Sequence, residues 1–261
     1  MSLTLASVSA DPYVLWDEMA GFEAADSDAA LDHLMTRLCQ RVDGHNALCL
    51  GAVRLPEMLP GDPLRGWRVG LNRHLHAAPT FATPVRDLAE HADGETGSTA
   101  ARNVALAGCW RANRLVDLVG AAWFESAYYR DFYLAGGLGD AIWGVCPVNE
   151  DAEVYIGVFR PATDPRFSAA ERDIVAELLR GLKWYFRQLL LSHGLCLANA
   201  PLTPAEREVV RLLLGGGGER EIAAELGQSV HTTHEHIKRI YRKFGVSNRP
   251  ALAALWLGAN P

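Results

Sequence analysis

Residues 227–246 read Gly-Gln-Ser-Val-His-Thr-Thr-His-Glu-His-Ile-Lys-Arg-Ile-Tyr-Arg-Lys-Phe-Gly-Val, and this stretch decides the fold of the C-terminal part of the chain. A turn containing Gly227 and Ser229 leads into a helix with an apolar seam and a basic, histidine-bearing face. A shorter helix over 221–226 leads into that turn. Two short helices joined by a glycine-containing turn, with cations on the second, are typical of a helix-turn-helix that reads DNA.

Charge is distributed unevenly along the 261 residues. The formal net charge of −6 argues against a protein that coats nucleic acid over its whole surface. Residues 201–261 carry 8 Lys and Arg against 6 Asp and Glu, a net of +2, whereas residues 1–200 carry 17 against 25, a net of −8. This asymmetry predicts a small DNA-binding module joined to an acidic partner domain.

A segment with Gly, Asn and Pro at 193–201 is typical of a connection between domains. We therefore expect a sensing and dimerisation domain over 1–192, a linker over 193–201 and a DNA-binding domain over 202–261. Immediately after the linker, Thr203 and Glu206 form a capping box with Pro204 at the first helical position, which predicts the start of a helix.

The first 192 residues carry signals for both strands and helices. The continuous apolar run 47–50 predicts a strand covered on both faces. Ser168 and Glu171 form another capping box, which predicts one long helix to about residue 191. The other predicted elements are helices over 11–19, 28–42, 84–91, 98–107 and 123–134, a helix or strand over 111–119, strands over 46–55 and 67–71, and a hairpin of strands 141–148 and 153–160.

The C-terminal segment resembles the DNA-binding domain of LuxR/FixJ-type transcriptional regulators. The matching pieces are Leu-Thr-Pro-Ala-Glu-Arg-Glu-Val at 202–209, Glu-Ile-Ala-Ala-Glu-Leu-Gly at 221–227 and the quoted stretch from Thr232 to Val246, followed by Asn248-Arg249. The resemblance implies a four-helix bundle whose third helix enters the major groove and whose fourth helps dimerisation.

The same resemblance implies roles for side chains on the recognition helix. Thr232 is expected to cap that helix and touch phosphate. Base-edge contacts are expected from His234, Glu235 and Lys238, and phosphate contacts from His236, Arg239, Arg242 and Lys243. The chain departs from the family pattern at His234, where lysine is usual, and in the loop 215–218, which lacks a polar cap and predicts a loosely started second helix.

The N-terminal segment resembles GAF-like sensor domains in its strand, hairpin and long closing helix. We therefore expect an α+β fold, with a GAF/PAS-like antiparallel sheet and flanking helices ahead of an all-α helix-turn-helix domain. The acyl-homoserine-lactone domain of quorum-sensing receptors has a related α/β/α architecture and stays open as an alternative. The early acidic pair of a phosphoreceiver is missing, which argues against that class.

Aromatic residues suggest a ligand pocket, since such pockets are apolar with a few polar groups. The candidates are Trp110, Trp123, Phe124, Tyr128, Phe132 and Trp143, and a cluster of this kind is otherwise simply core. His74, His76 and His91 match no strong zinc spacing, so no metal is expected. The glycine runs match no phosphate loop, and no Gly-x-Ser-x-Gly elbow is present, so we expect neither a cofactor nor catalysis.

The five cysteines are dispersed without a CxxC pair, which favours free thiols in a reducing cytoplasm and leaves a redox-sensing cysteine open. The N-terminus lacks a signal-peptide pattern, and no stretch is long and apolar enough to span a membrane. These features predict a cytoplasmic protein.

Two classes of function follow from these patterns. The first is a homodimeric transcriptional regulator that binds double-stranded DNA and a small molecule, with RNA polymerase as a further candidate partner. The second is a protein-interaction domain that uses the helical bundle for docking instead of DNA reading. The cations between His231 and Arg249 favour the first.

Overall fold

The computed structural model describes residues 11–56, 60–77 and 99–259. Along the chain the elements are α1 (Pro12–Ala20), η1 (Ala24–Asp26), α2 (Ser27–Val42), β1 (Asn46–Arg54), β2 (Trp67–His74), α3 (Thr99–Val104), β3 (Arg111–Arg114), α4 (Leu115–Leu118), η4 (Ala121–Glu125), α5 (Ala127–Phe132), η5 (Leu134–Gly136), β4 (Asp140–Asn149), β5 (Ala152–Arg160), α6 (Ala169–Arg180), α7 (Lys183–Ser192), α8 (Pro204–Leu214), α9 (Glu219–Glu225), α10 (Val230–Phe244) and α11 (Arg249–Trp256). The expected helix over 84–91 lies outside the described residues.

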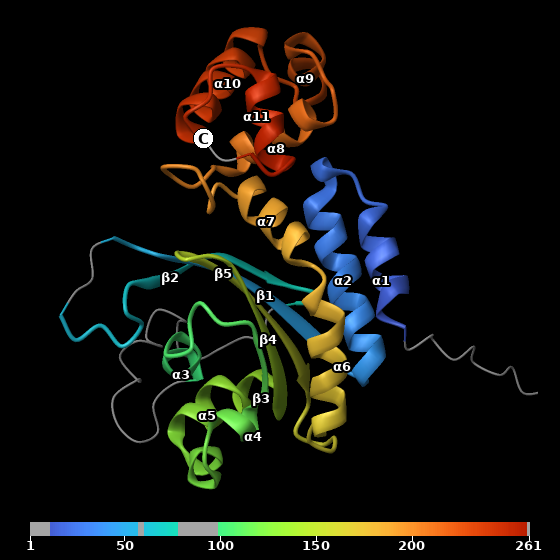
Figure 1. The fold of residues 1–261 in the computed structure, drawn as a ribbon, viewed down its shortest axis with the longest axis vertical. Coiled ribbons are helices and arrows are strands. Elements are labelled where there is room, and N and C mark those ends of the chain that lie inside the picture. The colour runs from blue at the N-terminus through green and yellow to red at the C-terminus, as the bar shows by residue number, and fades with distance from the viewer. Residues whose placement is uncertain (1–10, 57–59, 78–98, 260–261) are drawn as a thin grey trace, which may run out of the picture.

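The described strands form one antiparallel sheet in the order β2-β1-β5-β4-β3. The predicted hairpin is confirmed as β4 and β5, which occupy the centre of the sheet together with β1. Beyond the sheet, α8 to α11 form a separate helical bundle, which α7 joins to the rest of the chain (Figure 1). The α+β fold, with an antiparallel sheet, flanking helices and a C-terminal helical domain, is therefore confirmed.

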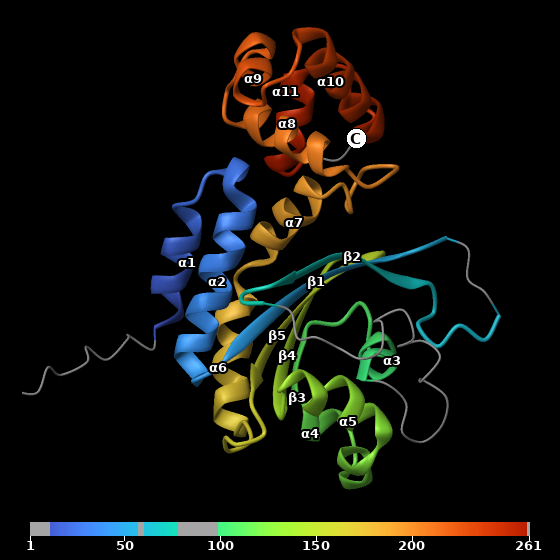
Figure 2. The ribbon, with the colours of Figure 1, turned by 180° about the vertical axis from the view of Figure 1, so that it is seen from behind.

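Different side chains cover the two faces of the sheet (Figures 1 and 2). On one face lie α1, α2, α6 and α7, whose aliphatic residues pack on Ala47 and Cys49 of β1. We call this cluster the helix-side core; it includes Leu15, Leu31, Leu34, Leu38, Val175, Leu178 and Leu190. The other face, toward α3, α4 and α5, carries the aromatic core of Trp67, Trp123, Tyr128, Tyr129, Tyr133, Trp143, Tyr155 and Phe159. The prediction that β1 is covered on both faces is confirmed.

The expected single helix over 123–134 is wrong. A 3-10 turn, η4, ends at Glu125, and α5 begins after Ser126. The Ser126 side chain accepts a hydrogen bond from the Tyr129 backbone N–H at 3.1 Å, so it caps a new helix instead of continuing the old one. This break lets Trp123 contact the rings of both Tyr129 and Tyr133.

The long helix expected after Ser168 is also interrupted, although its capping box is confirmed. Trp16 of α1 donates its indole N–H to the Leu178 carbonyl at 2.8 Å, which is the acceptor that the helix would need to continue. The same indole lies so close to Gly181 that a Cβ there would approach it to 2.5 Å. The chain therefore divides into α6 and α7 at Gly181 and Leu182. Residues 111–119, expected as helix or strand, contain both β3 and α4.

Residues 193–201 form a compact connection between α7 and α8. Leu195 and Cys196 are buried in it. The helix-side core continues through this connection into the bundle, where it includes Val209, Ile237 and Phe244. Over the described ranges, no helix combines the length and hydropathy that crossing a bilayer requires.

Candidate functional site

Helix α10 has caps at both ends. Ser229 accepts a hydrogen bond from the Thr232 backbone N–H at 3.0 Å, so Ser229 is the N-cap. The expectation that Thr232 caps this helix is therefore wrong. At the other end Gly245 adopts φ 65°, a left-handed conformation that glycine takes without steric cost and that commonly ends helices.

One side of α10 is buried and the other faces outward. Thr233, Ile237, Ile240 and Phe244 are buried against α8 and α9. These positions recur at helical spacing, so the seam expected from the sequence is present. The outward side carries His231, Thr232, Lys238, Arg239 and Arg242, all exposed, with His234, Glu235 and His236 half-exposed.

The predicted base-reading residues make local contacts. His234 Nδ1 lies 3.1 Å from Glu219 Oε2 on α9. The Lys238 ammonium lies 3.1 Å from Glu235 Oε1, and this contact lowers the pKa of Glu235. Because these groups are in contact with solvent, the ion pairs are weak and can be exchanged for contacts with bases or phosphates.

The structure places Lys243 differently from the other cations of α10. Its ammonium donates to Glu206 Oε2 and to the Pro201 carbonyl, both at 2.7 Å, and thus joins α10 to the linker and to the start of α8. Burial alone would raise the pKa of Glu206, but hydrogen bonds from Lys243 and Thr203 lower it overall. In this arrangement the Lys243 charge serves an internal contact.

The glycine loop before α9 is held from two sides. Glu221 accepts a hydrogen bond from the Gly218 backbone N–H at 2.8 Å, which holds the N-cap residue in place, although no side chain caps the first turn of α9. The Arg249 guanidinium of α11 donates to the Leu213 and Gly217 carbonyls. The loop thus lacks a side-chain cap, as expected from the sequence, and hydrogen bonds to Glu221 and Arg249 hold it instead.

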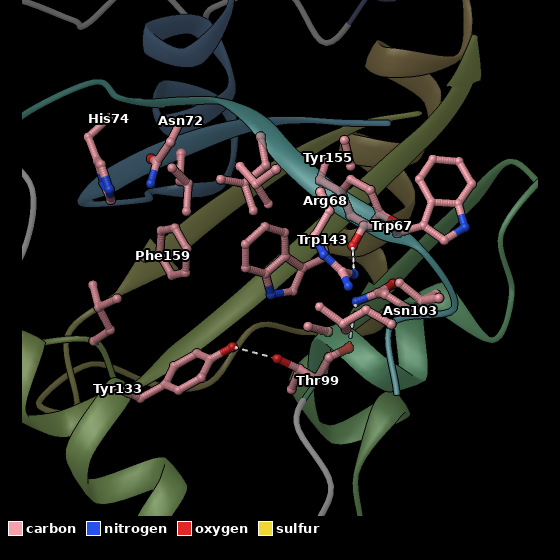
Figure 3. A pocket seen from close by; sticks show the side chains of 18 of the residues that line it. Trp67, Arg68, Asn72, His74, Thr99, Asn103, Tyr133, Trp143, Tyr155 and Phe159 are labelled. Carbon is pink, nitrogen blue, oxygen red and sulfur yellow. Dashed lines mark hydrogen bonds between the residues drawn. The ribbon is translucent and has the colours of Figure 1, made fainter. Parts of the chain in front are cut away.

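A cavity of about 180 Å³ lies between the sheet and α3 (Figure 3). Strand β1 contributes Leu48, Leu50 and Ala52, which alternate along the strand and so share one face. Further lining comes from Leu64, Trp67, Arg68, Val69, Asn72, His74, Thr99, Ala100, Asn103, Val104, Tyr128, Tyr133, Leu138, Trp143, Tyr155 and Phe159. The lining is thus mainly apolar and aromatic, with a few polar groups, which is the usual composition of a small-molecule site.

A group of hydrogen-bonding side chains lies at one side of this cavity. The Thr99 hydroxyl lies 3.3 Å from the Tyr133 hydroxyl (Figure 3). Burial raises the pKa of Tyr133 to about 12, so the phenol keeps its proton in neutral solution. The Trp143 indole N–H is buried near the Tyr133 hydroxyl and lowers its pKa, but no hydrogen bond of normal geometry from this N–H is found among the described residues. Because an indole N–H is only a donor, it matches a ligand oxygen.

The positive charge of Arg68, which lines the cavity, is already paired with a carboxylate. Arg68 donates to Asp62 at 3.0 Å, and burial lowers the pKa of His74, which favours its neutral form. No carboxylate is found among the described residues that line the cavity. The described lining therefore suits an uncharged ligand.

A buried ion pair fixes the end of α3 next to the cavity, and sequence reasoning missed it. Arg111 and Glu153 lie 3.1 Å apart with side chains 7% and 0% exposed. Glu153 also accepts from the Tyr155 hydroxyl at 2.6 Å and from the Gly108 backbone at 2.8 Å, while Arg111 donates to the Asn103 carbonyl. The available signal was Glu153, an acidic residue in the otherwise apolar segment 152–159.

The aromatic residues proposed as a pocket do not all meet there. Tyr128 and Trp143 line the cavity. Trp123 packs among the tyrosines of α5, Phe124 lies 3.9 Å under the Arg166 guanidinium, and Trp110 lies 5.5 Å from that of Arg180. The side chain of Phe132 is outside the described part. Lining residues such as Thr99, Asn103 and Tyr133 were missed because only the tertiary fold brings α3 and α5 over the sheet.

The histidines raised as metal ligands are not gathered into a site. Within the described ranges no group of three or more His, Cys, Asp or Glu side chains is arranged to hold a metal ion. His91 lies outside those ranges.

Comparison with known proteins identifies the C-terminal domain. The family described as bacterial regulatory proteins, luxR family, matches residues 200–256. The transcriptional regulatory protein UhpA of Escherichia coli (strain K12) is 49% identical over 53 residues, which cover 20% of this chain and 27% of UhpA. The probable transcriptional regulatory protein SgaR of Hyphomicrobium methylovorum is 42% identical over 59 residues, which cover 23% of this chain and 28% of SgaR. The match thus spans about a quarter of the length of these relatives.

Two solved structures are similar to a larger part of the chain. SdiA in complex with octanoyl-rac-glycerol has a TM-score of 0.43 at 14% identity and covers 97% of this chain and 95% of its own. The VqsR LBD domain from Pseudomonas aeruginosa has a TM-score of 0.44 at 14% identity, and the match covers 67% of this chain and 96% of the VqsR domain. The similarity to known regulators rests on the sequence match: residues 200–256, which hold α8 to α11, match the luxR family of bacterial regulatory proteins.

Proposed function

We propose that the protein is a homodimeric transcriptional regulator that binds double-stranded DNA through α10 and a small molecule through the cavity of a GAF-like N-terminal domain. The observation that carries this proposal is the exposed cationic side of α10 within a luxR-family domain. In this proposal Lys238 and Glu235 contact base edges and Arg239 and Arg242 contact phosphates. Dimerisation would place two copies of α10 at half-sites about one DNA turn apart.

The ligand proposed for the cavity is an uncharged amphiphile. Its apolar part would lie against Leu48, Leu50 and Phe159, and an oxygen of its polar end would accept from the Trp143 indole. An acyl-homoserine lactone belongs to this chemical class, so a quorum-sensing receptor is the more specific form of the same proposal. Native mass spectrometry of freshly purified protein would test it, since a retained molecule gives its mass directly.

DNA binding is tested by the salt dependence of the affinity for a fluorescent duplex. Each phosphate contact contributes a slope of about −0.9 to a plot of log affinity against log salt. Arg242→Ala should weaken binding to every sequence and reduce this slope by about one contact. Arg54→Ala is the control, since Arg54 is an exposed arginine of β1 that pairs with Asp151. Affinity that is independent of salt would contradict DNA binding and favour the alternative, a bundle that docks on proteins.

The remaining features of the proposal are location and partner. A regulator that reads chromosomal DNA works in the cytoplasm of a bacterium, and RNA polymerase is the partner through which such a regulator activates transcription. Co-purification of RNA polymerase on an immobilised duplex, with and without this protein, would test that contact.

A further inference from the structure

Strand β2, at the edge of the sheet, separates the cavity from the linker. On the cavity side β2 presents Trp67, Val69 and Asn72. On the opposite side the buried Leu195 of the linker lies against the same strand, where a Cβ added to Gly70 would approach Leu195 Cδ2 to 2.5 Å. Only the backbone of one strand therefore lies between the ligand cavity and the connection to the DNA-binding domain.

Gly70 is an extra residue in the pairing of β1 with β2. Gly51 pairs with Leu71 and Ala52 pairs with Val69, so Gly70 is left out of the register. Such a bulge disrupts the ladder locally, and among the described strands β2 has a neighbour on one side only. The wall of the cavity that faces Leu195 is thus an edge strand whose pairing is interrupted at Gly70.

The linker after Leu195 is tied to the recognition helix. The Leu195 backbone N–H donates to the Leu190 carbonyl, which keeps this residue at the end of α7. The Asn199 N–H donates to the Lys243 carbonyl of α10 at 2.9 Å, and the Lys243 ammonium returns a bond to Pro201. The last carbonyls of a helix lack partners within it, so Asn199 supplies one of them.

From these contacts we infer that Leu195 couples the two domains: it contacts β2 at the Gly70 bulge and transmits a change in the cavity wall to the C-terminal end of α10. The inference rests on the proposed function, because it assumes that the cavity holds a ligand. It assigns a positioning role to Leu195 and Gly70, which contact neither ligand nor DNA.

Amide hydrogen exchange of the full-length protein tests the coupling without a ligand. Gly70→Ala adds a methyl group in the space of Leu195 and should speed exchange at Asn199 by about tenfold. Leu195→Ala should have a similar effect, whereas Leu195→Met, which keeps the volume, should leave exchange within about twofold of wild type. Gly120→Ala is the control, because a Cβ there meets nothing within 4 Å.

The double variant Gly70→Ala with Leu195→Ala separates this coupling from general damage to β2. If Gly70→Ala acts through Leu195, it should not speed Asn199 exchange further once the leucine is gone. A second increase of about tenfold in the double variant, or unchanged exchange in Gly70→Ala, would overturn the inference.

A further experiment measures the same amide hydrogen exchange with the uncharged fluorescent probe N-phenyl-1-naphthylamine bound to the protein. The probe should change the exchange rate at Asn199 in the wild type and leave it unchanged in Leu195→Ala. If the probe binds to the wild type without changing the exchange rate at Asn199, the inference is also overturned. Failure of the probe to bind counts against ligand sensing alone, since the variants Gly70→Ala and Leu195→Ala still decide whether Leu195 links β2 to α10.

Discussion

The two faces of the sheet differ in how completely they are filled. On the helix-side core, branched aliphatic side chains interdigitate, and this core continues through the linker into the helical bundle. On the aromatic core, large planar rings meet edge to face and enclose a cavity of about 180 Å³. The first face therefore joins the sheet to the rest of the molecule through close packing, and the second provides space for a ligand.

The strongest test of this comparison removes the ion pair that supports the hollow side. Glu153→Ala leaves the Arg111 guanidinium buried without its carboxylate and should lower the free energy of unfolding by about 3–5 kcal/mol. Urea denaturation of the variant and the wild type measures this change in the free energy of unfolding. Asp151→Ala, an exposed acid in the same hairpin, should cost less than about 1 kcal/mol. If both variants behaved alike, the pair would not be what supports the cavity wall.

A second test compares equal deletions on the two faces. Leu38→Ala on the helix-side core should destabilise by about 2–5 kcal/mol, because it opens a void in a filled region. Leu50→Ala only enlarges an existing cavity from a half-buried position and should cost no more than about 2 kcal/mol. Urea denaturation measures the loss in free energy of unfolding for both variants. Equal losses would show that both faces are equally well packed.

Local patterns in the sequence predicted most of the helix-side face and the bundle. Capping boxes at Ser168 and Thr203, the hairpin of β4 and β5, and the buried seam of α10 depend on residues a few positions apart, and all are present. The breaks at Ser126 and Gly181 were missed. At Gly181 the cause is long-range, since Trp16 takes the carbonyl that would extend the helix.

The cavity was only partly predictable for the same reason. Tyr128 and Trp143 were recognised as aromatic candidates, but Thr99 and Asn103 have no distinguishing pattern and reach the cavity only through the packing of α3. Lys243 resembles the other cations of α10 in sequence, and its internal role depends on the distant Glu206. Such pairings are set by tertiary structure.

A third prediction concerns how the helix-side core continues into the bundle. The folded-state pKa of Glu206 lies below its ordinary value of 4.5, so its ionised form stabilises the fold above about pH 4.5, and this contribution is lost as pH falls through the lowered pKa. Glu206→Gln keeps a capping side chain but loses the charge facing Lys243, so it should lower the melting temperature by about 2–4 °C at pH 7 and less at pH 3. Glu208→Gln, at an exposed position, is the control.

The smallest effect on stability is expected on the exposed side of α10. Lys238 is exposed and pairs with Glu235 one turn away, so Lys238→Ala should change the free energy of unfolding by no more than about 0.5 kcal/mol. Its effect should instead appear in DNA binding: selection from a random duplex library should lose preference at one base pair, worth about 1–3 kcal/mol of discrimination. Arg242→Ala is the matched variant, because loss of a phosphate contact weakens all sequences alike. If Lys238→Ala also weakened every sequence equally, Lys238 would be a phosphate contact, and base reading by α10 would have to come from Glu235 and His234.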